Sequence, residues 1–250
     1  MAATFNDAPT KTVQVEGTDF AYRVIGDAGG PPIVLLHHFT GVLDDWDPAV
    51  IDGLAPERRV IIFDNRGVGR SQGKTPDSVE AMAKDAIAFI GALGFAHVGT
   101  GPAGGKGTSN LGAILQDAFQ NAAAQKKHPK HFLFFSQTKT SQAAADAFLA
   151  RLQARKNDRD PAASNETTQA QSAAIIQWGK SDGAKKLSAI SHPVLVANGD
   201  NDIMVPTINS VALFQALPNA KLSIFPDAGH GGIFQYHREF TEQALRFFGT

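Results

Sequence analysis

Residues 193–206 read Pro193-Val-Leu-Val-Ala-Asn-Gly-Asp200-Asn-Asp202-Ile-Met-Val-Pro206, an apolar run that ends in an acidic turn. The run predicts a buried strand with a carboxylate at its end. A second strand is predicted over Lys221–Phe225, and Ala228-Gly-His230-Gly follows it. An acid after one strand and a histidine after the next are the last two members of a Ser…Asp…His series in chain order. We therefore expect His230 to form an acid–base pair with one of the two carboxylates of this turn, Asp200 or Asp202.

Strands and helices alternate in the first hundred residues. Residues 11–25 alternate apolar and polar side chains around Gly17, which predicts an antiparallel hairpin. Continuous apolar runs over 32–37 and 59–64 predict strands buried on both faces. Helical spacing predicts helices over 46–54 and 78–93. This alternation predicts the α/β class, with a mostly parallel sheet flanked by helices.

The composition changes between the two strand-rich parts. Residues 110–186 are rich in Ala, Gln and Lys, and we expect helices over 111–125, 142–155 and 167–178. The polar stretch 156–165 is expected to be a solvated loop. The predicted organisation is therefore an α/β core over 1–109 and 187–250, closed by a helix over 236–248, with a helical insert over 110–186.

Charge and composition exclude several functions. The formal net charge of −1 argues against a nucleic-acid partner, which requires a basic face. No run reaches the roughly 18 apolar residues of a membrane span, and the N-terminus lacks the pattern of a signal peptide. The chain has no cysteine, and so neither a disulfide nor a thiolate nucleophile. We expect a cytoplasmic protein that does not bind membranes.

Four segments together resemble the α/β-hydrolase superfamily, in particular its cap-bearing esterase, lactonase and haloperoxidase-like members. The segments are His37-His-Phe-Thr-Gly41, Asp64-Asn-Arg-Gly-Val-Gly-Arg-Ser71, Gly199-Asp-Asn-Asp202 and Ala228-Gly-His230-Gly. The resemblance implies that the insert is a cap. It also implies hydrolysis of a small ester, lactone or related acyl compound without a cofactor, in a protein that could form a homo-oligomer.

The resemblance assigns roles to matching residues. His230 would be the general base and Asp202 the acid that orients it, while Asp200 would cap the turn. The backbone N–H of Phe39 would donate to the oxyanion, although His38 stands where the family commonly has glycine. The 64–71 turn is interpreted as structural, with Arg66 and Arg70 holding neighbouring loops. The run Phe132–Phe135 could either line an apolar pocket or form the core of the cap.

The nucleophile is missing from its expected place. In the family, a strand and a Gly-x-Ser-x-Gly elbow follow the helix that here ends near Gly94. Residues 95–98 begin like that strand, but Gly99 opens a loop that resembles the one leading into the cap. The sequence therefore suggests that a strand–elbow–helix–strand unit of roughly 30 residues or more is absent between Val98 and Gly99.

The alternatives to a lost elbow are weak. Gly179-Lys-Ser181-Asp-Gly183 has the elbow pattern, but a predicted helix precedes it instead of a strand. Ser109 misses the spacing by one residue. Residues 99–104 match Gly-x-Gly-x-x-Gly without the strand and helix that a dinucleotide site needs, and 105–107 fail the phosphate-loop pattern. His128 and His131 read as a solvated basic turn, so we predict neither metal nor cofactor.

Two hypotheses remain open. One is an α/β-fold hydrolase that uses Asp202 and His230 with no assignable nucleophile. The other is a non-catalytic relative, whether a deletion variant, a pseudoenzyme or an engineered chain, which keeps at most a binding cleft. The sequence therefore leaves open whether the chain is an enzyme.

Overall fold

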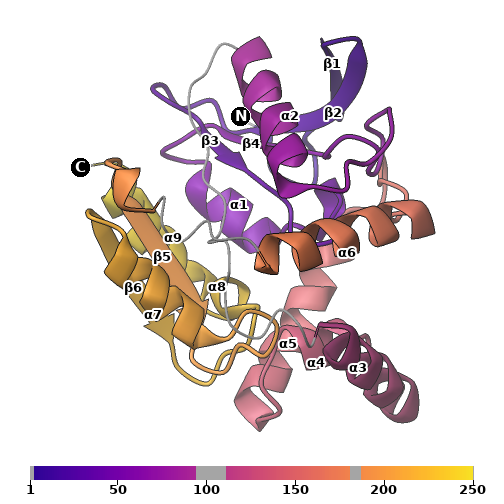
Figure 1. Ribbon diagram of the computed structural model, residues 1–250, viewed down its shortest axis with the longest axis vertical. Coiled ribbons are helices and arrows are strands. Elements are labelled where there is room, and N and C mark those ends of the chain that lie inside the picture. The colour runs from indigo at the N-terminus through magenta and orange to yellow at the C-terminus, as the bar shows by residue number, and fades with distance from the viewer. Residues whose placement is uncertain (1–2, 94–110, 181–186, 250) are drawn as a thin grey trace. The chain divides into compact units, whose positions relative to one another are not determined.

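The computed structural model describes residues 3–93, 111–180 and 187–249 (Figure 1). By their internal contacts the residues form two compact units. The first unit comprises residues 1–101 and 151–178, and the second comprises residues 102–150 and 179–250.

A four-stranded sheet organises the first unit. Its strands are β1 (Lys11–Val15), β2 (Thr18–Ile25), β3 (Ile33–Leu35) and β4 (Val60–Phe63), in the order β1-β2-β4-β3. The predicted hairpin is confirmed, because β1 and β2 pair antiparallel around Gly17, whose φ of +77° suits a residue without a side chain. Strand β4 pairs antiparallel with β2 and parallel with β3, so this sheet is mixed.

Burial in this sheet follows the position of each strand. All four residues of β4 are buried, as predicted, because β4 lies between two neighbours. In β3 only Ile33 is buried, so the prediction of burial along the whole strand is wrong there. Within the described residues β3 is an edge strand, and an edge strand leaves more of its side chains uncovered.

Helices flank the sheet as predicted. Helix α2 (Val79–Ala92) begins after Ser78, whose side chain accepts the N–H of Ala81. It lies along the sheet in Figure 1 and stacks Phe89 on Phe63 at a centroid distance of 4.1 Å. The other helices among the described residues of the first unit are the 3-10 turn η1 (Leu43–Asp45), α1 (Pro48–Leu54) and α6 (Asn165–Gly179).

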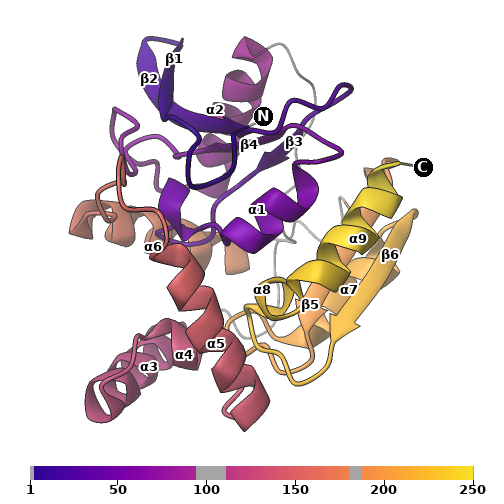
Figure 2. The same ribbon diagram turned by 180° about the vertical axis from the view of Figure 1, so that it is seen from behind.

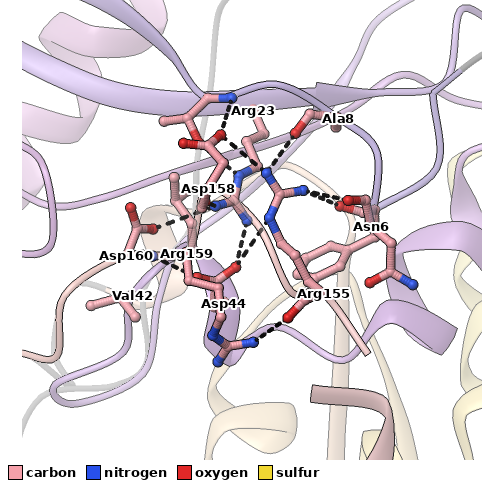
Figure 3. Close-up of polar contacts among 12 residues, drawn as sticks. Asn6, Ala8, Arg23, Val42, Asp44, Arg155, Asp158, Arg159 and Asp160 are labelled. Carbon is pink, nitrogen blue, oxygen red and sulfur yellow. Dashed lines mark hydrogen bonds and ion pairs between the residues drawn. The ribbon is translucent and has the colours of Figure 1, made fainter. Parts of the chain in front are cut away.

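The buried ion pairs Arg23–Asp160 and Arg155–Asp44, at 3.8 and 3.6 Å, join the stretch before α6 to the N-terminal part of the first unit (Figure 3). Arg23 of β2, which is fully buried, donates to Asp44 Oδ1 at 2.8 Å, and the backbone N–H of Asp160 donates to the other oxygen of Asp44 at 2.6 Å. Arg155 donates to the backbone carbonyls of residues 5, 6 and 8. The prediction that 156–165 is simply solvated is therefore wrong at Asp160, whose side chain is fully covered.

The second unit contains two parallel strands, β5 (Val194–Gly199) and β6 (Ala220–Phe225), as predicted. Helix α7 (Thr207–Ala216) lies on one face of this pair and α9 (His237–Phe248) on the other (Figures 1 and 2). The single-turn helix α8 (Gly232–Gln235) follows the predicted histidine and contacts β5.

Three further helices belong wholly or mostly to this unit, namely α3 (Leu111–Gln125), α4 (Lys130–Leu133) and α5 (Lys139–Leu152). Phe148 of α5 packs between Phe134 and Phe234, stacking on Phe234 at 4.9 Å, so the aromatic run beginning at Phe132 contributes to the core. His131 is 5% exposed and contacts Asp146 at 2.8 Å. The prediction of a solvated turn is wrong for this histidine.

The two compact units do not coincide with the predicted core and insert, because α6 groups with the N-terminal sheet while α3 and α4 group with β5 and β6. The division into core and cap therefore stays a prediction. In the part of the chain that the structure describes, no helix combines the length and apolar character needed to cross a bilayer.

Candidate functional site

His230 and Asp202 are in direct contact in the second unit. The Nδ1 atom of His230 lies 2.9 Å from Asp202 Oδ2. Because a carboxylate only accepts, Nδ1 carries the proton and Nε2 presents its lone pair. Among the described residues, no hydrogen-bond partner lies on Nε2, and the His230 side chain is 25% exposed. The geometry leaves a ring nitrogen able to accept a proton.

Backbone groups fix the carboxylate. Asp202 Oδ1 accepts the N–H groups of Met204 and Val205 at 2.8 and 2.9 Å. The side chain is 1% exposed, and these bonds compensate for its burial. The turn after β5 thus holds the Asp202 carboxylate through one of its oxygens and leaves the other oxygen for the imidazole.

The parallel pairing of β5 and β6 brings the two residues together. Both follow the carboxyl end of a strand, and such ends meet at one edge of a parallel sheet. Asp200 instead accepts the N–H of Ala228 at 3.1 Å, which ties the two turns to each other. Gly199, the last residue of β5, is packed so closely that a Cβ would collide with the carbonyl oxygens of Ala228 and Gly229.

An aromatic wall lies beside the imidazole. The ring of Phe134 meets His230 edge-on, with centroids 5.3 Å apart, and its backbone oxygen accepts the N–H of Gly231 at 2.7 Å. The sequence offered the run Phe132–Phe135 as either pocket lining or core, and Phe134 belongs to the core: it is 4% exposed and packs against Phe148 and Phe234. No sequence signal distinguished it from the neighbouring phenylalanines, since only the fold selects the ring that reaches the histidine.

The predicted oxyanion loop, residues 37–41, lies in the first unit. Within the described residues, the N–H of Phe39 donates to no acceptor, whereas its carbonyl accepts from Thr40 Oγ1 at 2.7 Å and from His38 Nδ1 at 2.8 Å. The left-handed residue is Thr40, with φ +58°, and not His38. The glycine-to-histidine departure at His38 therefore creates no backbone strain at that position.

The turn over Asp64–Ser71 ties neighbouring segments together, as its structural interpretation predicted. Asp64 accepts the N–H groups of Leu43 and Arg70, and Arg66 pairs with Asp85 at 2.6 Å. Burial, reinforced by the charge of Asp160, raises the pKa of Asp64 to about 8.

The remaining candidates cannot be placed. Ser181, Ser109 and the junction at Val98 and Gly99 lie outside the described residues, as do the glycine-rich segments over 99–107. Helix α6 does run up to Gly179, so a helix precedes the Gly-x-Ser-x-Gly pattern as predicted. Within the described ranges, no three histidine or acidic side chains gather as a metal site would require.

Sequence comparison now identifies the family. A family model described as alpha/beta hydrolase fold matches the chain in two segments, residues 31–101 and 94–235, which share residues 94–101. The matched residues make up more than half of the chain. The chain therefore belongs to the alpha/beta hydrolase fold family.

Individual relatives agree with this assignment. An alpha/beta hydrolase fold protein from Chitinophaga pinensis superimposes with a TM-score of 0.92 at 38% identity, covering 98% of this chain and 99% of that one. A non-heme haloperoxidase from Rhodococcus erythropolis is 27% identical, covering 86% of this chain and 90% of its own length. A bifunctional esterase/perhydrolase from Acinetobacter calcoaceticus is 23% identical, covering 86% and 91%.

The haloperoxidase alignment also contains unmatched positions. It runs over 250 positions, yet 86% of the 250 residues of this chain is about 215. About 35 aligned positions therefore have no residue in this chain.

Proposed function

We propose that this chain hydrolyses a small ester, lactone or related acyl substrate, with His230 as general base and Asp202 as the acid that orients it. The observation that carries the proposal is the 2.9 Å contact between His230 Nδ1 and Asp202 Oδ2, in a histidine whose side chain is 25% exposed. The name of the esterase/perhydrolase relative supports the acyl substrate class.

With no assigned nucleophile, water is the group for His230 to activate. Nε2 takes a proton from water as the water oxygen attacks the acyl carbon, and the carbonyl electron pair moves onto oxygen. Asp202 stabilises the imidazolium that forms. The carbonyl then re-forms, the C–O bond to the alcohol breaks, and the imidazolium returns its proton to the departing oxygen. By family resemblance, the N–H of Phe39 is the proposed donor to the oxyanion.

We infer in addition that the serine elbow is absent from this chain. The two family-model segments overlap at residues 94–101, which bracket the junction at Val98 and Gly99. The unmatched positions in the haloperoxidase alignment are about as many as a strand–elbow–helix–strand unit contains. These observations also favour the second candidate, a non-catalytic relative that keeps a binding cleft. The proposed core remains 1–109 and 187–250, with 110–186 as the cap.

Hydrolysis of p-nitrophenyl acetate and butyrate separates the two candidates. The wild type is compared with His230→Ala and Ser181→Ala, and His192→Ala serves as a control because it removes an exposed histidine elsewhere in the second unit. Mass spectrometry after treatment with a serine-reactive phosphonate then tests for an activated serine.

The proposal predicts turnover that disappears in His230→Ala, persists in His192→Ala and Ser181→Ala, and leaves no phosphonylated serine. A single phosphonylated serine would name a nucleophile and overturn the water route. Hydrolysis that is the same with and without His230 would establish the non-catalytic alternative.

A further inference from the structure

Helix α6 presents a polar buried face to the loops of the first unit. Thr167, Gln171 and Ala174 are 2%, 4% and 0% exposed, at the i, i+4, i+7 spacing of one helix face. A buried amide side chain is costly unless it is hydrogen-bonded. The oxygen of Gln171 accepts the backbone N–H of Thr40 at 2.7 Å, and the Thr167 hydroxyl donates to the carbonyl of Gly67 at 2.9 Å. The face therefore reaches two different loops.

Thr40 is the residue of the oxyanion loop that most needs external support. Its φ of +58° is left-handed, which is a strained conformation for a β-branched residue. Such a residue persists only when its surroundings hold it. The hydrogen bond from its N–H to Gln171 is one restraint, and that from its hydroxyl to the carbonyl of Phe39 is another. The peptide between Phe39 and Thr40 is thus held from both sides.

The anchorage of α6 makes Gln171 a fixed support. The stretch before the helix is tied to the rest of the first unit by hydrogen bonds: Arg155 donates to the carbonyl of Ala8, and the backbone N–H of Asp160 donates to Asp44 (Figure 3). Ser164 caps the helix by accepting the N–H of Thr167 at 3.1 Å. A side chain projecting from a helix held in this way has little freedom to follow the loop.

We propose that Gln171 is a positioning residue for the oxyanion loop: by accepting the Thr40 N–H it holds the Phe39–Thr40 peptide and so limits the rotation of Phe39, whose own N–H is the proposed oxyanion donor. The inference rests on the proposed role of Phe39. A donor that must meet charge only in the transition state is effective when it is already aligned. Loss of the support should therefore lower kcat more than it alters KM.

Three variants separate positioning from general stability. Gln171→Met keeps the volume but loses the strong acceptor, whereas Gln171→Glu keeps a carbonyl-like acceptor at the same reach. Thr167→Val is the matched control, because it removes the hydrogen bonds of the Thr167 hydroxyl to Gly67 and Thr75 from the same helix face without touching Thr40. Each is assayed for kcat and KM on p-nitrophenyl butyrate, and for hydrogen exchange of the Thr40 amide by NMR.

We expect Gln171→Met to lower kcat roughly tenfold, a part of what a whole oxyanion donor contributes, with KM within about twofold. The Thr40 amide should exchange at least about tenfold faster. Gln171→Glu should keep both kcat and the exchange rate of the Thr40 amide near their wild-type values. Thr167→Val should change neither quantity. Unchanged exchange and kcat in Gln171→Met, or equal losses in Thr167→Val, would overturn the inference. If the wild type shows no His230-dependent turnover, the proposed function fails, while exchange of the Thr40 amide still decides whether Gln171 holds the loop.

Discussion

Asp202 divides its two oxygens between the backbone and His230. One oxygen accepts two backbone N–H groups of its own turn, and the other lies 2.9 Å from the imidazole Nδ1. This division fixes the tautomer as well as the position of the ring, since Nδ1 must carry the proton that Asp202 accepts. The carboxylate is therefore needed for its chemistry and not only for its shape.

Replacing Asp202 by Asn tests that requirement. The amide oxygen can still accept from the turn, but the amide nitrogen then faces Nδ1 and donates to it, so the proton moves to Nε2 and the base is lost. We expect His230-dependent ester hydrolysis to fall by at least about a hundredfold, measured as kcat/KM.

Asp200→Asn is the matched control, because Asp200 contacts a backbone N–H and not the histidine. We expect its kcat/KM to stay within about threefold of the wild type, since surface changes away from the reacting groups have small effects. Equal losses in the two variants would mean that the acidic turn acts through its structure alone.

Gly199 tests how tightly the turn that carries the acid is packed. A methyl group at this position collides with backbone oxygens at residues 228 and 229, which cannot move as a side-chain end can. We expect Gly199→Ala to lower the free energy of unfolding by about 2–3 kcal/mol in urea titrations followed by circular dichroism. Gly112→Ala, with open space around its position in α3, should be neutral or slightly stabilising. A neutral Gly199→Ala would show that the two turns separate easily.

The sequence predicted those parts of the molecule that depend on local pattern. The Gly17 hairpin and strand β4 follow from periodicity, and the Asp202–His230 contact follows from two parallel strands that each end in a reactive residue. Helix α7 escaped prediction because its burial is inverted: Asn209 and Ser210 are buried while Ile208 is 53% exposed. A helix with that arrangement shows no amphipathic period.

Contacts between distant segments were not predictable in the same way. Gln171 and Thr40 are 131 residues apart, and Arg155 meets the carbonyl of Ala8 across 147 residues. A glutamine or an arginine in a polar helix or loop reads as solvated, because most such residues are. Only the fold shows which ones are covered and must find partners.

Arg155 gives a stability test of the buried ion pairs. Its side chain is 3% exposed and satisfies three backbone carbonyls as well as Asp158. Arg155→Met should lower the free energy of unfolding by about 3–5 kcal/mol, because it leaves buried acceptors and acids without their cation. Arg246→Met should change it by less than about 0.5 kcal/mol, since Arg246 and its partner Glu242 are both largely exposed. Similar small losses in both variants would contradict a structural role for the cluster.

Asp160 makes stability depend on pH in a predictable direction. Burial raises its pKa from 3.8 to about 6, with Asp44 adding to the shift and Arg23 opposing it. Between about pH 4 and pH 6 the folded state therefore binds this proton more tightly than the unfolded state does. The contribution of Asp160 to the free energy of unfolding must fall as pH rises through that window and stay constant above it.

Asp160→Asn removes this dependence. A shift of about two pKa units corresponds to about 3 kcal/mol, so the wild type should lose about 2–3 kcal/mol more than the variant between pH 4 and pH 7 in urea titrations. Asp158→Asn is the control of opposite sign: burial opposes ionisation of Asp158, but hydrogen bonds from Thr10 and Arg70 outweigh it and lower the pKa. The ionised Asp158 stabilises the folded state fully at every pH above the pKa it has in the unfolded chain. The free energy of unfolding of Asp158→Asn should therefore change with pH in parallel with that of the wild type over most of the window. If the free energy of unfolding of Asp160→Asn also changed with pH in parallel with that of the wild type, Asp160 would have to be ionised at low pH and paired with Arg23 and Arg70 as in an ordinary ion pair.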